Sequence, residues 1–236
     1  MIPFQNGPNS NHLILELCAY NIQSCRIADR AGAGRIELCS NPSQGGVTPS
    51  YGLVKYALEH ISIPVFPMIR PRGGGFVYDA DEVAIMKKDI LLCRDMGCVG
   101  IATGVQLATG GIDTETMKHI VEWAYPMEVT CHKVFDVTPD GFQSLEDLIA
   151  AGCKRILTSG LQKTAVDGAS MLTQLVAVAA GRITIMPGGS VRSSNITQLV
   201  QETGAKEFHS SGLTGQSQLY VADQDEVREM AGKLKH

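Results

Sequence analysis

The chain alternates short β-branched runs with segments of helical pattern, and no linker or shift in composition interrupts the rhythm. The expected strands are residues 13–20, 35–39, 63–70, 99–103, 128–132, 155–159, 182–186 and 206–210. Eight strand–helix units in 236 residues give roughly 30 residues per unit, which matches a (β/α)8 barrel of about 250 residues. We therefore predict an α/β fold, a TIM (β/α)8 barrel, in a single domain.

Cap residues support this prediction. Asn21, Ser50, Asp79 and Asp113 stand where helices should begin, and later helices are expected over residues 144–151, 165–180 and 193–203. Glycines 32, 97, 152, 181 and 204 stand where helices end before a strand. A doubly wound sheet usually has a G-x-G-x-x-G turn after its first strand, but this chain has Ala-Tyr-Asn-Ile at 19–22. The expected domain organisation is a polar N-terminal extension over 1–12 and a barrel over 13–236, closed by a C-terminal helix that Asp223 caps.

Composition excludes several function classes. The net charge is −4 and no dense Lys/Arg run occurs, which argues against a nucleic-acid or anionic-membrane partner. No apolar stretch reaches the roughly 18 residues of a membrane span, and the N-terminus is polar, unlike a signal peptide. The 7 cysteines are an odd number and lie mostly in apolar strands or helices, so we expect reduced thiols and a cytoplasmic protein.

A repeated tripeptide points to a chemical site. Glu-Leu-Cys occurs at 16–18 and at 37–39, each time at the end of an expected strand. Successive side chains of a strand point to opposite faces, so the carboxylate and the thiol share one face in both copies. The same alternation places Glu16, Glu37, Arg70, His132, Glu207 and His209 at or inside one barrel mouth. Such a set must form a hydrogen-bonded network. Such a network can serve stability alone, but Val, Ile and Leu in the barrel would stabilise the fold without buried charges. We therefore favour the interpretation that the network has a function.

Three loops after expected strands are suited to an anion. Arg70 and Arg72 stand on a Pro-stiffened turn followed by glycines. Gly188-Gly189 follows the seventh strand and Ser210-Ser211 ends the eighth. Loops after strands seven and eight of such barrels often bind phosphate through backbone N–H groups.

The ordered motifs resemble the CutC copper homeostasis family. They are Arg35-Ile-Glu-Leu-Cys-Ser40, Gly45-Gly46 with Thr48-Pro-Ser50, Ile69-Arg-Pro-Arg-Gly-Gly74, Phe135-Asp136, Leu157-Thr-Ser-Gly160, Met186-Pro-Gly-Gly189 and Glu207-Phe-His-Ser-Ser211. The resemblance covers nearly the whole chain. It implies a TIM barrel, a cytoplasmic homo-oligomer (a dimer or tetramer), a role in copper tolerance, and Cu(I) bound by Cys18 and Cys39. Soft thiolates suit Cu(I).

Two functions therefore remain open. The first is a copper homeostasis protein that binds Cu(I) through Cys18 and Cys39. The second is an enzyme that acts by acid/base chemistry on a small anionic substrate, phosphorylated or not. Its catalytic candidates are Glu16, Glu37, His132, Asp136 and His209, and its anion-binding candidates are Arg70, Arg72, Ser159, Gly188, Gly189, Ser210 and Ser211. The residues alone do not define a reaction class.

Overall fold

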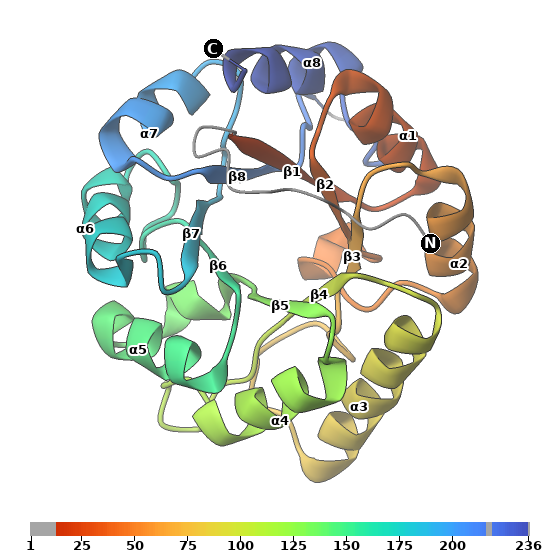
Figure 1. Ribbon diagram of the computed structural model, residues 1–236, viewed down its shortest axis with the longest axis vertical. Coiled ribbons are helices and arrows are strands. Elements are labelled where there is room, and N and C mark those ends of the chain that lie inside the picture. Colours follow the sequence, from red (N-terminus) through yellow and green to blue (C-terminus); the bar gives the residue numbers. More distant parts are fainter. Residues whose placement is uncertain (1–12, 216–218, 236) are drawn as a thin grey trace.

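A ring of eight parallel strands surrounded by helices forms the molecule (Figure 1). The structure is a computed structural model that describes residues 13–215 and 219–235. It confirms the predicted TIM barrel in a single domain. The expected N-terminal extension, residues 1–12, lies outside the described residues.

All eight expected strands are present. They are β1 (Ile14–Ala19), β2 (Arg35–Leu38), β3 (Val65–Pro67), β4 (Gly100–Thr103), β5 (Glu128–Cys131), β6 (Arg155–Thr158), β7 (Thr184–Pro187) and β8 (Glu207–Ser210). Each is somewhat shorter than its apolar run, because the last residues of several runs leave the ladder to enter the loops at the mouth.

The helices follow the strands in strict alternation. They are α1 (Ile22–Ala31), α2 (Tyr51–His60), α3 (Ala80–Asp95), α4 (Thr114–Ala124), α5 (Gly141–Ala151), α6 (Ala169–Ala179), α7 (Ile196–Thr203) and α8 (Gln224–Lys233), with short 3-10 helices η1 (Pro42–Gln44) and η2 (Lys133–Val137). The side chains of Asn21, Ser50, Asp79 and Asp113 each accept a hydrogen bond from the backbone of the following helix, as predicted.

Three helix starts differ from the sequence prediction. α5 begins earlier, at Gly141, because the Asp140 carboxylate accepts hydrogen bonds from two backbone N–H groups of its first turn. α6 and α7 begin later, at Ala169 and Ile196. The residues ahead of α6 belong instead to a loop, in which the backbone N–H of Ala165 donates to the carbonyl of Gly189 at 2.9 Å.

The strands pair in the order β3-β2-β1-β8 and β4-β5-β6-β7. A parallel bridge between Met68 and Ala102 joins β3 to β4, and β7 and β8 lie side by side to close the ring. The register sets the Cα of Glu16 beside those of Arg35 and His209, and the Cα of Cys18 beside that of Glu37. Side chains of neighbouring strands at one level therefore meet inside the barrel, as the alternation predicted.

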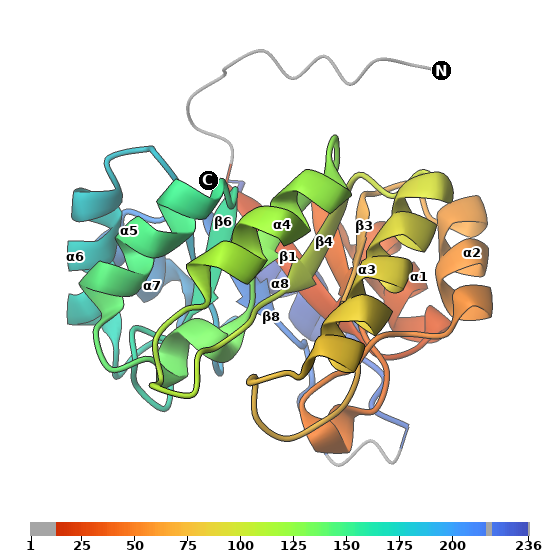
Figure 2. The same ribbon diagram turned by 90° about the horizontal axis from the view of Figure 1, so that it is seen from below.

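The apolar core lies between the strands and the helices. Leu17, Ile36, Leu38 and Phe208 point outward from their strands and are fully buried there. The barrel interior holds the buried polar side chains together with a small apolar cluster that includes Met68 and Ala102. The loops after the strands, including that of η1, project from one side of the ring (Figure 2). None of the helices in the described residues is long and apolar enough to cross a membrane.

Candidate functional site

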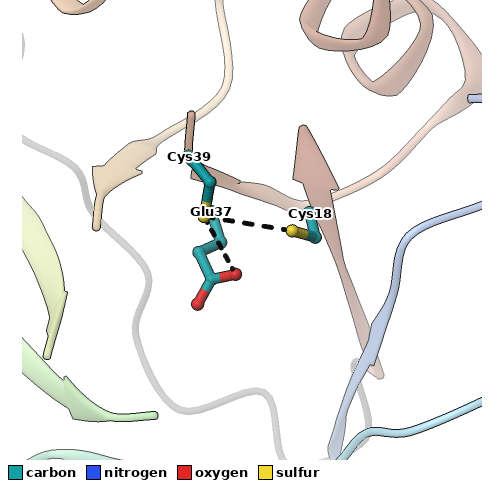
Figure 3. Close-up of side chains that lie close together, drawn as sticks. All are labelled: Cys18, Glu37 and Cys39. Carbon is teal, nitrogen blue, oxygen red and sulfur yellow. Dashed lines mark hydrogen bonds between the residues drawn. The ribbon is translucent and has the colours of Figure 1, made fainter. Parts of the chain in front are cut away.

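Two thiols and a carboxylate meet at the end of β1 and β2. The sulfurs of Cys18 and Cys39 lie 4.0 Å apart, and the Sγ of Cys39 lies 3.6 Å from the Oε2 of Glu37. Figure 3 shows the three side chains converging on one point. All three are buried, and one ligand atom from each lies within 4.8 Å of the others. Sulfur is a soft ligand that favours Cu(I), so a set of two sulfurs and one oxygen suits Cu(I) at least as well as it suits a harder ion.

The surroundings shift the pKa values of the two thiols in opposite directions. The hydrogen bond with Cys39 holds the pKa of Cys18 well below its usual value, and His209 adds to this against the cost of burial. The same thiol–thiol hydrogen bond, together with burial, raises the pKa of Cys39 well above its usual value. Cys18 is therefore the more acidic thiol of the pair, and the thiolate is the form that ligates metals.

His209 joins the thiols to a second group of acids. Its Nδ1 lies 2.8 Å from Oε1 of Glu16, and its Nε2 lies 3.8 Å from Oε2 of Glu37. Burial opposes charge on this ring, but Glu37, Cys18 and Glu16 outweigh burial and raise the pKa of His209 well above its usual value. Burial also raises the pKa of Glu37, and the Cys18 charge adds to the rise. The site thus combines an imidazole of raised pKa, a thiol of lowered pKa and a carboxyl group of raised pKa.

Buried arginines neutralise the carboxylates deeper in the barrel. Arg35 contacts Glu16 through Nε and Glu207 through Nη2, the latter at 2.5 Å, while the Nε of Arg155 reaches Glu207 at 3.0 Å. Burial works against ionisation of Glu16, but the charges of Arg35 and His209 prevail and lower its pKa well below its usual value. Sequence reasoning missed Arg35 and Arg155 as partners. Arg35 lies two residues before Glu37, so strand alternation was the signal that could have found it.

A cavity of about 130 Å³ opens beside the thiols. Its lining includes Cys18, Glu37, Met68, Arg70, Phe76 and His132. Among the described residues, three buried polar atoms of this wall have no hydrogen-bond partner: Oε1 of Glu37, Nε of Arg70 and Nε2 of His132. Buried polar groups are normally satisfied, so three in one wall indicate a ligand. Tyr20 and Lys133 also line the cavity, although no pattern in the sequence pointed to either residue.

The two arginines expected to hold an anion have different surroundings. Arg70 is buried, and its Nη atoms donate to the backbone carbonyls of Gln44, Gly46 and Gly74, so it ties two loops of the mouth together. The guanidinium of Arg72 is half-exposed and contacts Glu82 at the start of α3. Arg72 is therefore absent from the wall of the cavity.

The other expected site residues shape the rim. The Asp136 carboxylate accepts hydrogen bonds from the hydroxyls of Thr158 and Ser159 and from two backbone N–H groups of the loop after β6. With its oxygens occupied in this way, Asp136 positions that loop, and Ser159 is occupied with it. Neither residue is among those that line the cavity.

The loops after β7 and β8 lie at the same rim. Gly189 has φ +98°, and a Cβ built there would lie 3.5 Å from the Nζ of Lys133. Gly188 approaches His209 so closely that a Cβ there would lie 3.3 Å from the Cβ of that histidine. Arg192 donates to the hydroxyl of Ser210 at 3.2 Å and lies 3.5 Å from that of Ser211. The predicted anion-binding loops are thus together, with their hydroxyls bound to Arg192.

The fold and this site define a class: a TIM barrel whose mouth carries a buried thiol pair above a network of ion pairs. The family model described as the CutC family matches residues 13–214, and the chain belongs to the CutC copper homeostasis family.

Relatives agree with this assignment. A CutC protein of Parabacteroides distasonis is 49% identical over 199 residues, which cover 84% of this chain and 82% of that protein. The copper homeostasis protein cutC homolog of Homo sapiens is 40% identical over 210 residues, covering 89% and 77%. The crystal structure of CutC from Streptococcus agalactiae superposes with a TM-score of 0.81 at 36% identity, covering 86% of this chain and 100% of that one. Phosphoribosylanthranilate isomerase from Pyrococcus furiosus, with a TM-score of 0.61 at 13% identity over 95% of this chain and 99% of that one, shares the fold alone.

Proposed function

We propose that this protein binds Cu(I) as its cargo through the sulfurs of Cys18 and Cys39, with Glu37 as the third ligand. The observation that carries the proposal is the 4.0 Å separation of two buried sulfurs, with a carboxylate oxygen 3.6 Å from one of them. The relatives named as copper homeostasis proteins support the choice of metal. Because the seven cysteines are all free and buried, a reducing compartment such as the cytoplasm suits this function.

The sulfur spacing is compatible with one bound ion. Two thiolates bound at about 2.3 Å from a metal are about 4.0 Å apart when a third ligand completes a trigonal plane. The pair therefore needs little rearrangement, and the hydrogen bond with Cys39 already lowers the pKa of Cys18. Binding would displace the proton that Cys39 keeps, since a thiol must lose its proton to ligate.

A competition titration with a chromogenic Cu(I) chelator tests this proposal under anaerobic conditions. We expect one tightly held Cu(I) per chain, and at least a hundredfold loss of affinity in the Cys18→Ser, Cys39→Ser double variant. The matched control is Cys25→Ser, since Cys25 is a buried cysteine of α1 that is not among the residues lining the cavity. Equal affinity in the double variant and in the control would sink the proposal.

A second function, acid/base catalysis on a small anion, is favoured by one specific observation. The unpartnered atoms of Glu37, Arg70 and His132 share the wall of the cavity. A two-thiolate site requires neither Arg70 nor His132. In this alternative, Glu37 is the acid/base candidate, because burial raises the pKa of its carboxyl group well above its usual value. Screening small organic acids and phosphate esters for turnover, with Glu37→Gln as the inactive control, tests it. Turnover that persists in Glu37→Gln would exclude that role.

A further inference from the structure

The ring of His132 is fixed in one orientation and one tautomer. It follows β5 directly, and its Nδ1 accepts a hydrogen bond from the backbone N–H of Val134 at 3.2 Å. An acceptor nitrogen carries no proton, so in the neutral ring the proton is on Nε2. The backbone of Gly104 approaches the same part of the ring, since an added Cβ would lie 2.9 Å from Nδ1 and Cε1. The hydrogen bond from Val134 therefore defines the tautomer of the ring.

The Nε2–H of His132 is a hydrogen-bond donor without an acceptor among the described residues. Burial, aided by the neighbouring charge of Arg70, lowers its pKa to about 3, so the ring is neutral near pH 7. Its Nε2–H is buried and has no partner among residues 13–215 and 219–235. An unsatisfied buried donor costs roughly 1–3 kcal/mol. A ligand that offers an acceptor to this atom would recover that cost.

A second buried donor, on a cationic group, lines the same cavity. The Nε of Arg70 has no partner among the described residues, and its guanidinium lies 4.9 Å from the ring of Phe76. Phe76 in turn packs 4.9 Å from the ring of His132. Lys133 also lines the cavity, with its Nζ 3.6 Å from Oδ2 of Asp136, and Glu37 and Cys18 complete the polar part of the lining. The two unpartnered donors, one of them on the guanidinium of Arg70, call for an anionic acceptor.

The apolar part of the cavity wall indicates what else the ligand contains besides its anionic group. Met68, Phe76 and Leu157 give the cavity an apolar side, and its volume is about 130 Å³. A water molecule needs only about 10–15 Å³ of such space, so the cavity has room for a molecule of a few non-hydrogen atoms. An apolar wall suits a short carbon chain better than the uniformly polar surface of inorganic phosphate.

We propose that this cavity is a second binding site, next to the thiol pair, for a small organic carboxylate whose oxygens accept hydrogen bonds from Nε2 of His132 and Nε of Arg70. The short carbon chain lies against Met68 and Phe76. His132 acts as a neutral donor and leaves acid/base chemistry to other groups. The site does not depend on Cys18 or Cys39 as metal ligands.

A titration with propionate at pH 7, followed by ¹⁵N NMR of the histidine rings, tests the proposal on the unmodified protein. We expect the His132 ring to be in the Nε2–H tautomer and its Nε2–H signal to shift saturably as propionate binds. Two results would overturn the proposal. One is an Nδ1–H tautomer, and the other is no saturable shift of the Nε2–H signal when propionate is raised to 50 times the protein concentration and to about 50 millimolar. Inorganic phosphate is the parallel arm, and tighter binding of phosphate than of propionate would overturn the assignment to a carboxylate.

His132→Asn separates the donor from the fold. The Oδ1 of an asparagine can replace Nδ1 as the acceptor for Val134, while the Nε2–H is removed. We expect its propionate affinity to fall about tenfold or more. The control is His119→Asn on α4, where the ring is exposed. Equal propionate affinity in the two variants contradicts the proposal.

Cu(I) binding distinguishes this site from the copper site. We expect His132→Asn to retain wild-type Cu(I) affinity, and the Cys18→Ser, Cys39→Ser variant to retain propionate binding. A parallel loss of Cu(I) affinity in His132→Asn would show that His132 serves the metal, which contradicts the role inferred here. The carboxylate site can therefore fail while the copper proposal stands, and the reverse also holds.

Discussion

At the scale of single residues, the account depends on how buried charges are paired. Arg35 is the centre of this pairing, because it contacts both Glu16 and Glu207 and is 4% exposed. A buried ion pair adds little net stability, but removing one partner leaves an uncompensated charge in a medium of low dielectric constant. Arg35 is therefore the residue that compensates the charges of Glu16 and Glu207 together, while Arg155 and His209 each contact one of them.

Replacing Arg35 by methionine tests this pairing. We expect the free energy of unfolding to fall by about 3–5 kcal/mol, because Glu16 and Glu207 lose their shared partner. Urea denaturation measures the loss. Arg182→Met is the matched control, since Arg182 pairs with Glu146 on the surface, and exposed pairs contribute little. A loss no larger in Arg35→Met than in Arg182→Met would contradict the pairing described.

His132 makes stability depend on pH in a defined direction. Its pKa is lowered from 6.5 to about 3 in the folded protein, so the unfolded chain binds a proton first as the pH falls. The contribution of the ring is complete above about pH 6.5 and is lost progressively toward pH 3. Between pH 7 and pH 5 the loss is roughly 2 kcal/mol at 1.36 kcal/mol per pH unit.

Urea denaturation at pH 7 and pH 5 measures this contribution by difference. His132→Asn should lose less stability than the wild type between the two pH values, by roughly 2 kcal/mol. The exposed His119→Asn variant serves as the reference for removing a histidine. An unchanged pH dependence in His132→Asn would show that the ring is not held neutral.

The sequence predicted the charged inward side chains but not all their partners. Glu16, Glu37 and His209 were identified because strand alternation places them on one face, and the register brings them together. Arg72 was expected at the mouth, but its guanidinium contacts Glu82, ten residues later, and no pattern in the sequence signals that contact. Where a long side chain ends depends on tertiary neighbours, and alternation carries no information about them.

At the scale of elements, the loop after β2 covers the thiol pair. Gly46 has φ +90°, and a Cβ there would lie 3.2 Å from the Sγ of Cys39. Arg70 holds the carbonyl of Gly46 at 2.8 Å. The loop is therefore fitted against the sulfur, and this close approach requires a residue without a Cβ.

Gly46→Ala tests whether the loop positions the sulfur. We expect a loss of about 1–2 kcal/mol in stability from the left-handed backbone, and a weaker affinity for Cu(I) because the methyl group displaces Cys39. Gly97→Ala is the matched control, since Gly97 has φ +88° with nothing within 4 Å of an added Cβ. Chelator competition should show that only Gly46→Ala binds Cu(I) more weakly. Equal Cu(I) affinities in the two variants would show that the loop does not position the metal site.

The elements themselves were predictable from the sequence to a large degree. Strand positions follow from apolar runs, and four helix starts follow from side-chain caps that are present. The start of α6 was placed too early because Ala165 looks helical by composition. Its backbone N–H instead bonds to Gly189 across the mouth, a contact between loops that no local pattern encodes.

At the scale of the whole molecule, the barrel concentrates its chemistry at one end. The strands bring polar residues from β1, β2, β5 and β8 to a single mouth, and the helices enclose them with an apolar layer. The fold alone does not determine a function, since an isomerase shares it at 13% identity. The function must therefore be tested at the thiol pair.

Anomalous diffraction from crystals soaked with Cu(I) under anaerobic conditions tests the central claim most directly. The account predicts one copper peak per chain, between the sulfurs of Cys18 and Cys39 and within bonding distance of a Glu37 oxygen. Soaks of the Cys18→Ser, Cys39→Ser variant should show no peak at this position. A peak at another position in the wild type, or no peak at this position when Cu(I) is saturating, would contradict the account.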